Sequence, residues 1–206
     1  MRDLRAALAP FRCWDARTRD IFEARGAPVD DCALQNREEL LGLCELMERE
    51  EVSSYLEIGV WTGGTVRAIC GLFPAMRVAA CDQGYAETLG LSIRLPARVD
   101  FFRGDSESEG YRRWREALGQ VDLVLIDANH AYHAVKRDFE RERGLPHRML
   151  ALHDITGATR QTTGVRRLWE EINDGFKLEI VRPHPEIGLE RSRMGIGVWS
   201  AGPIGL

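Results

Sequence analysis

The sequence predicts an α/β fold in which seven strands form one mostly parallel sheet with helices on both faces. Short aliphatic and β-branched runs alternate with helix-like stretches from residue 53 onward. Parallel neighbours need crossover connections, and helices of this length supply them, so the alternation predicts a mostly parallel sheet. The last two runs are joined by a loop instead of a helix, which predicts that the seventh strand is antiparallel.

Seven runs are predicted to be strands. They span residues 53–58, 77–81, 98–103, 121–126, 149–152, 177–182 and 194–199. The segment "PHPEIGLERS" between the last two runs contains Pro183 and Pro185 and reads as a loop. We therefore expect the sixth and seventh strands to pair antiparallel at one edge of the sheet.

Helices are predicted where apolar residues recur at helical spacing. The stretch "GVRRLWEEI" carries one apolar stripe, formed by Val165, Leu168, Trp169 and Ile172. The stretch "NREELLGLCELMEREE" carries another, formed by Leu40, Leu43, Cys44 and Met47. The latter precedes the first strand, so we expect an amino-terminal helical segment over residues 1–50, acting as a lid or a dimer contact. Residues 51–206 would form the main domain.

Composition and charge limit the kinds of partner. The 206 residues are 44% hydrophobic and 29% charged, ordinary values for one globular domain, and the formal net charge is -4. This acidic balance argues against nucleic acid or an anionic membrane as a partner and favours a small molecule. Five cysteines without CxxC spacing suit buried thiols in a reducing compartment. Without a stretch apolar enough for a signal peptide or a membrane span, we expect a cytoplasmic protein.

The first strand-to-helix turn, in "YLEIGVWTGGT", is the candidate ligand site, because open α/β sheets bind ligands at the carboxyl ends of their strands. A dinucleotide fingerprint would place glycines at positions 59, 61 and 64, the middle one where pyrophosphate approaches the backbone. Trp61 occupies that middle position, and its indole would crowd a diphosphate. No Walker-type GKS or GKT follows, so the expected ligand lacks phosphates.

Acidic residues follow the next two strands, where a nucleoside would be held. Asp82, with Gln83 beside it, ends the second strand, and a carboxylate there can accept both hydrogen bonds of a ribose diol. Asp105 and Ser106 follow the third strand in "RGDSES", in position to hydrogen-bond an adenine edge. In this order, the features predict a nucleoside-like ligand with a compact polar tail.

This order of features resembles the class I S-adenosylmethionine-dependent methyltransferases. The first motif of that Rossmann-like class is an acidic residue followed by GxxxGG or a near variant, matched here by Glu57, Gly59, Gly63 and Gly64. The resemblance covers roughly residues 53–200. It implies that S-adenosylmethionine is the cofactor and that its amino-acid tail meets the first turn, with Trp61 as a wall beside the methionine moiety.

Later stretches resemble one subgroup of that class, which includes sugar and antibiotic O-methyltransferases and proteins named after cephalosporin hydroxylase. The chain reads "IDANHAYHAVKRDF", "HDI" and "GVRRLWEEI" where that subgroup has "IDGDHSYEGVKRDF", "HDI" and "GVxxLWxEL". Asp127 and Asp154 end the fourth and fifth strands, so neighbouring strands would place both on one rim. Ala128 and Asn129 depart from the subgroup's pattern.

The subgroup resemblance implies a role for each of these residues. Asp127 and Asp154 become metal ligands, His130 becomes the general base, and His153 stands where several relatives carry a carboxylate, as a third ligand. Asp127 also stands where other members of the class contact the amino group of the cofactor. A hard cation such as Mg²⁺ would lower the pKa of an acceptor hydroxyl. The expected activity is methyl transfer to a hydroxyl of a sugar or another natural product.

Other function classes stay open. His130, His153 and one of the aspartates could form the two-histidine, one-carboxylate site of a non-haem iron oxygenase. The altered "DANH" would suit a cofactor-binding paralogue without catalysis, and Trp61 makes NAD-dependent oxidoreduction the weakest alternative. A homodimer through terminal helices is compatible with this fold. Residues that select the acceptor are expected in the first 50 residues, in the loops after the fourth and fifth strands, and in residues 183–192.

Overall fold

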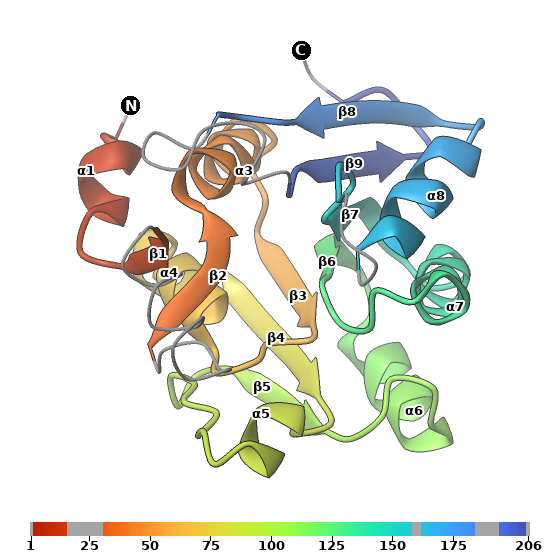
Figure 1. Cartoon of the computed structure of the whole chain (residues 1–206), viewed down its shortest axis with the longest axis horizontal. Helices are drawn as coiled ribbons and strands as arrows, with labels where there is room; N and C mark the ends of the chain where they lie inside the picture. The colour runs from red at the N-terminus through yellow and green to blue at the C-terminus, as the bar shows by residue number, and fades with distance from the viewer. Residues whose placement is uncertain (1, 16–30, 158–161, 184–193, 205–206) are drawn as a thin grey trace.

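The computed structural model describes residues 2–15, 31–157, 162–183 and 194–204 (Figure 1). Its helices are α1 (Leu4–Leu8), α3 (Arg37–Arg49), α4 (Gly64–Leu72), α5 (Tyr85–Thr88), α6 (Glu109–Leu118), α7 (Tyr132–Arg143) and α8 (Thr163–Glu171). Its strands are β1 (Arg12–Trp14), β2 (Cys32–Asn36), β3 (Ser54–Ile58), β4 (Arg77–Asp82), β5 (Asp100–Arg103), β6 (Val121–Ile126), β7 (His147–His153), β8 (Phe176–Ile180) and β9 (Ile196–Ser200).

Within the described part of the chain, the main sheet has seven strands in the order β5-β4-β3-β6-β7-β9-β8. All neighbours from β5 through β7 are parallel, and β9 runs antiparallel to β7 and β8. The predicted fold is therefore confirmed, including the antiparallel seventh strand and the sixth strand, β8, at the edge. Chain order reverses between β3 and β6, so the carboxyl ends of these strands border the crevice where open α/β sheets bind ligands.

Helices cover both faces of this sheet. Figure 1 shows α1, α3 and α4 on one side and α6, α7 and α8 on the other. Successive strand residues alternate between two cores: Tyr55 packs in the core under α3 and α4, whereas Leu56 and Ile58 pack in the core under α6 to α8. Because both faces are covered, all five residues of β3 are buried, as is usual for central parallel strands.

The two apolar stripes predicted for helices face these cores. Val165, Leu168 and Trp169 of α8 are buried, and Ile172 caps the end of that helix. The stripe of α3 is buried as well, with Leu40, Leu43, Cys44 and Met47 all inside. α3 begins after Asn36 because the Asn36 side chain accepts a hydrogen bond from the Glu38 amide at 3.0 Å, a common helix cap.

The amino-terminal segment contains two strands beside the predicted helices. β1 and β2 form a parallel pair that is separate from the main sheet. The sequence predicts a helical segment over residues 1–50, but the five residues Cys32–Asn36 form a strand that ends at the cap of α3. Residues 16–30 lie outside the described residues, so the lid and the dimer contact stay predictions.

Strand β2 packs against the first residue of α4. A Cβ built on Gly64 would lie 2.1 Å from the Cys32 carbonyl oxygen and 2.3 Å from the Ala33 amide nitrogen. Real Cβ atoms essentially never approach backbone this closely, so only glycine allows β2 to lie here. The amino-terminal segment is therefore part of the wall around the turn between β3 and α4.

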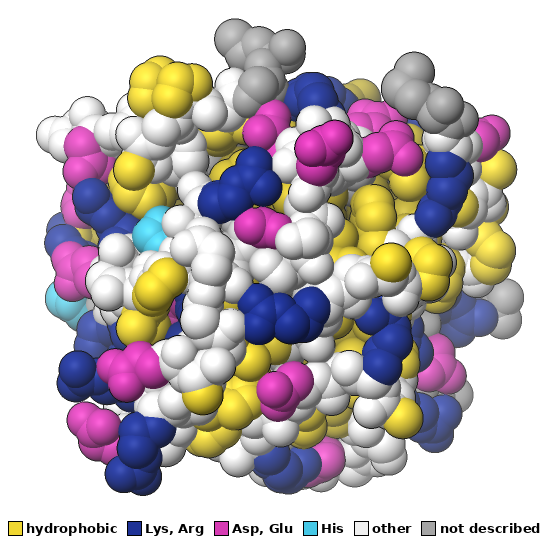
Figure 2. Space-filling model, turned by 180° about the vertical axis from the view of Figure 1, so that it is seen from behind, with side chains coloured by type: hydrophobic (Ala, Val, Ile, Leu, Met, Phe, Trp, Pro, Cys, Tyr) yellow, Lys and Arg dark blue, Asp and Glu magenta, His cyan; other side chains and the backbone are white. Residues whose placement is uncertain are grey.

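The surface of the molecule carries charges of both signs. Figure 2 shows Lys and Arg side chains interspersed with Asp and Glu on the face seen from behind. No helix within the described ranges has the length and apolar character needed to cross a membrane. All five cysteines are buried, as the sequence predicts.

We expect Gly64→Ala to destabilise the protein by about 1–3 kcal/mol, the usual cost of overpacking a tight contact. The new methyl group would push against the backbone of β2, whereas alanine in an unobstructed helix would be mildly stabilising. Urea unfolding measures the difference. The control is Gly202→Ala, whose Cβ meets nothing within 4 Å, and equal stabilities of the two variants would contradict the packing of β2 on α4.

Candidate active site

The turn between β3 and α4 lies at the carboxyl edge of the sheet. Gly59 and Gly63 have φ angles of +87° and +86°, and Trp61 between them has φ +53°. This left-handed region favours glycine, and holding a bulky residue there costs roughly 1–2 kcal/mol. Strain of this kind concentrates at functional sites. Position 61 thus has a glycine-like backbone, as in a dinucleotide turn, but carries an indole.

Asp82 holds this turn from the end of β4. Its Oδ2 accepts the amide N–H groups of Val60 at 2.9 Å and Trp61 at 3.1 Å, and its Oδ1 accepts that of Gly84 at 2.5 Å. A carboxylate offers about four lone-pair sites, so roughly one remains. A ribose diol could be held through both predicted hydrogen bonds only by displacing one of these amides.

Trp61 and Tyr85 form an aromatic pair beside the turn. Their ring centroids lie 5.9 Å apart with the planes tilted by 55°. Tyr85 is exposed, whereas the indole Nε1–H of Trp61 is buried without a hydrogen-bond partner among the described residues. An unsatisfied buried donor costs about 1–3 kcal/mol, so a ligand acceptor at this place would be stabilised.

Glu57, the acidic residue of the first motif, lies inside the protein. It is fully buried, and Tyr55 donates its hydroxyl to Glu57 Oε2 at 2.6 Å. Burial is the main cause that raises the pKa of Glu57 to about 8, and the nearby charge of Asp127 adds to it. At neutral pH the raised pKa favours the protonated form of Glu57, which lies in the interior of β3 beneath the turn's first residues.

Four side chains at the carboxyl ends of β6 and β7 form the centre of the candidate site. His130 Nε2 and His153 Nδ1 each lie 3.1 Å from Asp127 Oδ1. Asp154 Oδ2 lies 3.6 Å from His130 Nε2 and 3.9 Å from His153 Nδ1. The structure thus brings together all four residues that the sequence singled out at these two strand ends.

The two histidines of this group differ in exposure. The side chain of His130 is 27% exposed, whereas that of His153 is 3% exposed. A molecule at the rim can therefore contact His130 but not His153. Asp154 has φ +65°, so a second non-glycine residue in the left-handed region stands at a strand end of this site.

Electrostatics favour an ion pair between Asp127 and His153. Burial opposes the charged form of both groups. The charge of His153, with hydrogen bonds from both histidines, nevertheless holds the pKa of Asp127 well below its usual value. Against its own burial, the charges of Asp127 and Asp154 raise the pKa of His153 to about 10. Burial is the largest single effect on His130 and lowers its pKa, but the hydrogen bond to Asp127 and the charges of Asp127 and Asp154 together outweigh burial, so the pKa of His130 is raised too.

Gln35, at the end of β2, is a member of this site that sequence reasoning missed. Its Nε2 donates to Asp127 Oδ2 at 2.8 Å, its side chain is fully buried, and its Oε1 has no partner within the described residues. The residues are 92 positions apart in sequence. Gln35 follows the short apolar stretch "CAL" and offers no spacing or motif from which this contact could be predicted.

The residues predicted to hold adenine have other partners. Ser106 donates its hydroxyl to Asp138 of α7 at 2.8 Å, and Asp105 accepts the Glu107 amide at 2.9 Å. Asp105 and Gln83 are exposed. The roles of Gln83, Asp105 and Ser106 as cofactor contacts therefore stay predictions. Asp82, by contrast, contacts the glycine-rich turn directly.

The predicted magnesium ligands do not form a cation site as they lie. Across the described ranges, no group of three or more His, Cys, Asp or Glu side chains is arranged to hold a metal ion. Two of the four central side chains offer ring nitrogens, whereas Mg²⁺ prefers oxygen ligands. Both oxygens of Asp127 already accept hydrogen bonds from nitrogen donors. The geometry also gives no support to the iron alternative.

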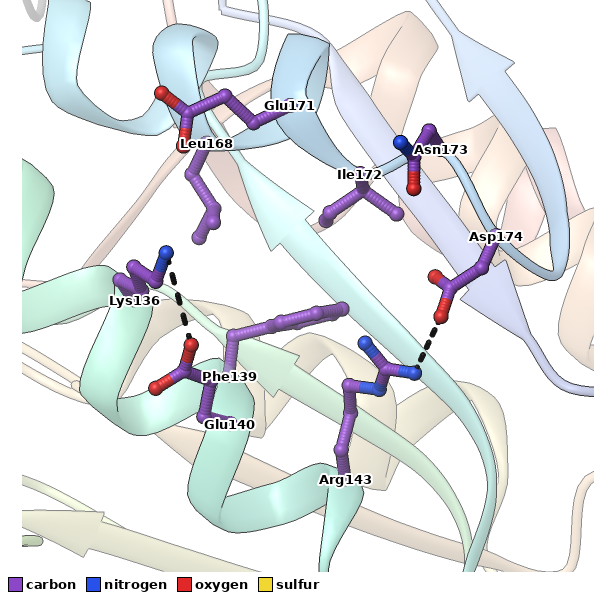
Figure 3. A pocket seen from close by; sticks show the side chains of 9 residues that line it. All are labelled: Lys136, Phe139, Glu140, Arg143, Leu168, Glu171, Ile172, Asn173 and Asp174. Carbon is purple, nitrogen blue, oxygen red and sulfur yellow. Dashed lines mark hydrogen bonds and ion pairs between the residues drawn. The ribbon is translucent and has the colours of Figure 1, made fainter.

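A separate hollow lies between α7 and α8, away from these residues (Figure 3). Apolar side chains, Phe139 among them, line it together with two ion pairs. Arg143 binds Asp174 at 2.7 Å, and Lys136 lies 3.7 Å from Glu140. No residue predicted for the site lines this hollow.

Comparison with known proteins shows that part of the chain is similar to methyltransferases. Residues 56–155 match a family model described as "Methyltransferase domain". This range begins in β3 and ends just after β7, so it contains both the glycine-rich turn and the Asp127 group. No curated protein matches the chain by sequence.

Solved structures show the same fold at low identity. The O-methyltransferase TomG from Streptomyces achromogenes, solved with SAM, is 18% identical, with a TM-score of 0.61 over 95% of this chain and 90% of that chain. An O-methyltransferase from Bacillus cereus, solved with SAH, is 17% identical, with a TM-score of 0.57 over 91% of each chain. A putative caffeoyl-CoA O-methyltransferase from Staphylococcus aureus is 14% identical, with a TM-score of 0.61 over 89% and 90%.

The ion pair at Asp127 predicts a pH dependence of stability. The folded pKa of His153, about 10, lies above its ordinary 6.5, so its stabilisation is full below pH 6.5 and is lost as pH rises toward 10. We expect the stability advantage of wild type over His153→Gln to shrink by an amount on the order of a few kcal/mol over that range. Urea unfolding at several pH values measures it, and a constant difference would contradict the ion pair.

Proposed function

The resemblance to the class I S-adenosylmethionine-dependent methyltransferases is confirmed by the family model and the fold, and from that premise we propose that this chain methylates a hydroxyl of a small molecule. The observation that carries the proposal is the pair formed by His130 and Asp127 at the carboxyl end of β6. His130 is the most exposed member of the group formed with Asp127, His153 and Asp154. This group borders the glycine-rich turn, because the backbone of Asp127 lies against Gly59. The proposed acceptor class is a sugar or another natural product.

The cofactor side of the proposal rests on the turn after β3. Gly59, Trp61 and Gly63 of this turn have left-handed backbone conformations. Asp82 at the end of β4 binds two amides of the turn. Trp61 fills the place where a dinucleotide would need a bare backbone, which favours a cofactor without a diphosphate. The indole N–H of Trp61, which has no partner within the described residues, and the ring of Tyr85 offer a donor and an apolar surface to S-adenosylmethionine.

The chemical step needs one proton acceptor. The acceptor oxygen forms a bond to the methyl carbon while the carbon–sulfur bond breaks, and its electron pair stays on sulfur in S-adenosylhomocysteine. The hydroxyl proton passes to His130, whose Nε2 is engaged by Asp127 so that Nδ1 is the ring nitrogen left to accept it. Asp127 orients the ring and stabilises the imidazolium that forms.

Positioning supplies the rest of the rate in this proposal. Methyl transfer requires the oxygen, carbon and sulfur to lie in line, and fixed orientation can be worth several orders of magnitude. No step is assigned to Mg²⁺, because the donor arrangement at Asp127 does not fit it. A homodimer and a cytoplasmic location remain proposals made from sequence alone.

His130→Gln tests the base directly. We expect methyl transfer from labelled S-adenosylmethionine, measured with an acceptor found by screening hydroxylated small molecules, to fall by about 10²- to 10⁴-fold. Affinity for S-adenosylhomocysteine should stay unchanged, because the histidine does not form the turn. His133→Gln is the matched control, since His133 is exposed in the first turn of α7, just after the loop that carries His130.

The pH profile gives a second readout of the same role. Because the pKa of His130 is raised above its ordinary 6.5, the rate should increase with pH through an apparent pKa above that value. The limb should disappear in His130→Gln. Wild-type rates for His130→Gln would remove the histidine from the mechanism and leave only cofactor binding.

A further inference from the structure

Gln35 completes a set of nitrogen donors around Asp127. The Gln35 amide lies 2.8 Å from Oδ2, and the two histidines lie 3.1 Å from Oδ1. The donors come from three segments that are far apart in sequence: the end of β2, the loop before α7 and the end of β7. Both oxygens of this largely buried carboxylate therefore accept hydrogen bonds from groups of the protein itself.

The position of Gln35 is fixed by its neighbours. The side chain is fully buried, and the next residue, Asn36, caps α3 and donates to the Arg182 carbonyl oxygen at 3.0 Å. Rotating the amide by half a turn would place its oxygen against the carboxylate of Asp127, which is repulsive. The amide N–H must therefore face Asp127 for as long as β2 stays packed.

The Gln35 amide N–H lies where a cation would have to approach Asp127 Oδ2. Magnesium binds oxygen ligands at about 2.0–2.1 Å in a near-octahedral arrangement, so it needs carboxylate lone pairs that face open space. At Asp127 the face toward Gln35 presents hydrogen atoms with partial positive charge. Such a group repels a cation and competes with it for Oδ2.

From this geometry we propose that Gln35 is a positioning residue that closes the Asp127 site to divalent cations and fixes the carboxylate that orients His130. By holding Oδ2, Gln35 sets the rotamer in which Oδ1 faces His130. The part about His130 rests on the proposed function. The closure toward cations is a binding property and does not depend on methyl transfer.

The test replaces the amide by a carboxylate of the same shape. Mn²⁺ and Mg²⁺ are titrated calorimetrically into EDTA-treated, desalted wild-type protein and into Gln35→Glu. We expect no saturable binding to wild type and one bound ion in Gln35→Glu, where two carboxylates would face each other. Gln120→Glu adds the same charge at an exposed position before the amino end of β6 and should behave like wild type.

Two outcomes would overturn the closure toward cations. One is saturable binding of a single ion to wild type, a result that needs no variant to fold. The other is a folded Gln35→Glu that binds S-adenosylhomocysteine but no ion. Gln35→Leu keeps the volume of the side chain but removes the donor to Asp127. In this variant the acid limb of the pH–rate profile for methyl transfer should shift relative to wild type. An unchanged pH–rate profile would refute the positioning role. Cofactor binding is measured separately, so failure of the proposed function is distinguishable.

Discussion

The largely buried carboxylate of Asp127, whose side chain is 15% exposed, makes the interactions on which the rest of the site depends. A buried anion is tolerated only when it is paired and hydrogen-bonded, and here donors from three segments meet it. Each of those segments is held in place by this contact: the amino-terminal strand through Gln35, the loop before α7 through His130, and the end of β7 through His153. Removing Asp127 would leave buried donors without an acceptor at the point where the parts of the fold join.

The same residue ties the polar group to the glycine-rich turn. A Cβ on Gly59 would lie 2.3 Å from the Asp127 carbonyl oxygen, so glycine is needed there for contact with the chain's own backbone. On the other side, the amides of Val60 and Trp61 are bound by Asp82. The turn and His130, the proposed base, thus belong to one connected arrangement, which suits a reaction that depends on alignment of three atoms.

Sequence reasoning predicted the layers and strand ends well, because those depend on periodicity and on the rule that parallel strands need crossovers. It could also group Asp127, His153 and Asp154, since each stands at the end of a strand, and the subgroup resemblance added His130. It could not find Gln35, because a contact across 92 residues leaves no local pattern. It also could not predict that Asp82 accepts three hydrogen bonds from backbone amides, since a sequence does not show which backbone groups will lie next to a carboxylate in the fold.

The most direct measurement is calorimetric titration of S-adenosylhomocysteine into EDTA-treated protein, with NAD titrated in parallel. We predict saturable binding of one S-adenosylhomocysteine per chain without any added metal. We predict no binding of NAD, because Trp61 occupies the place of the dinucleotide glycine. Absence of S-adenosylhomocysteine binding, or equal binding of NAD, would contradict the assignment of the turn to a methyltransferase cofactor.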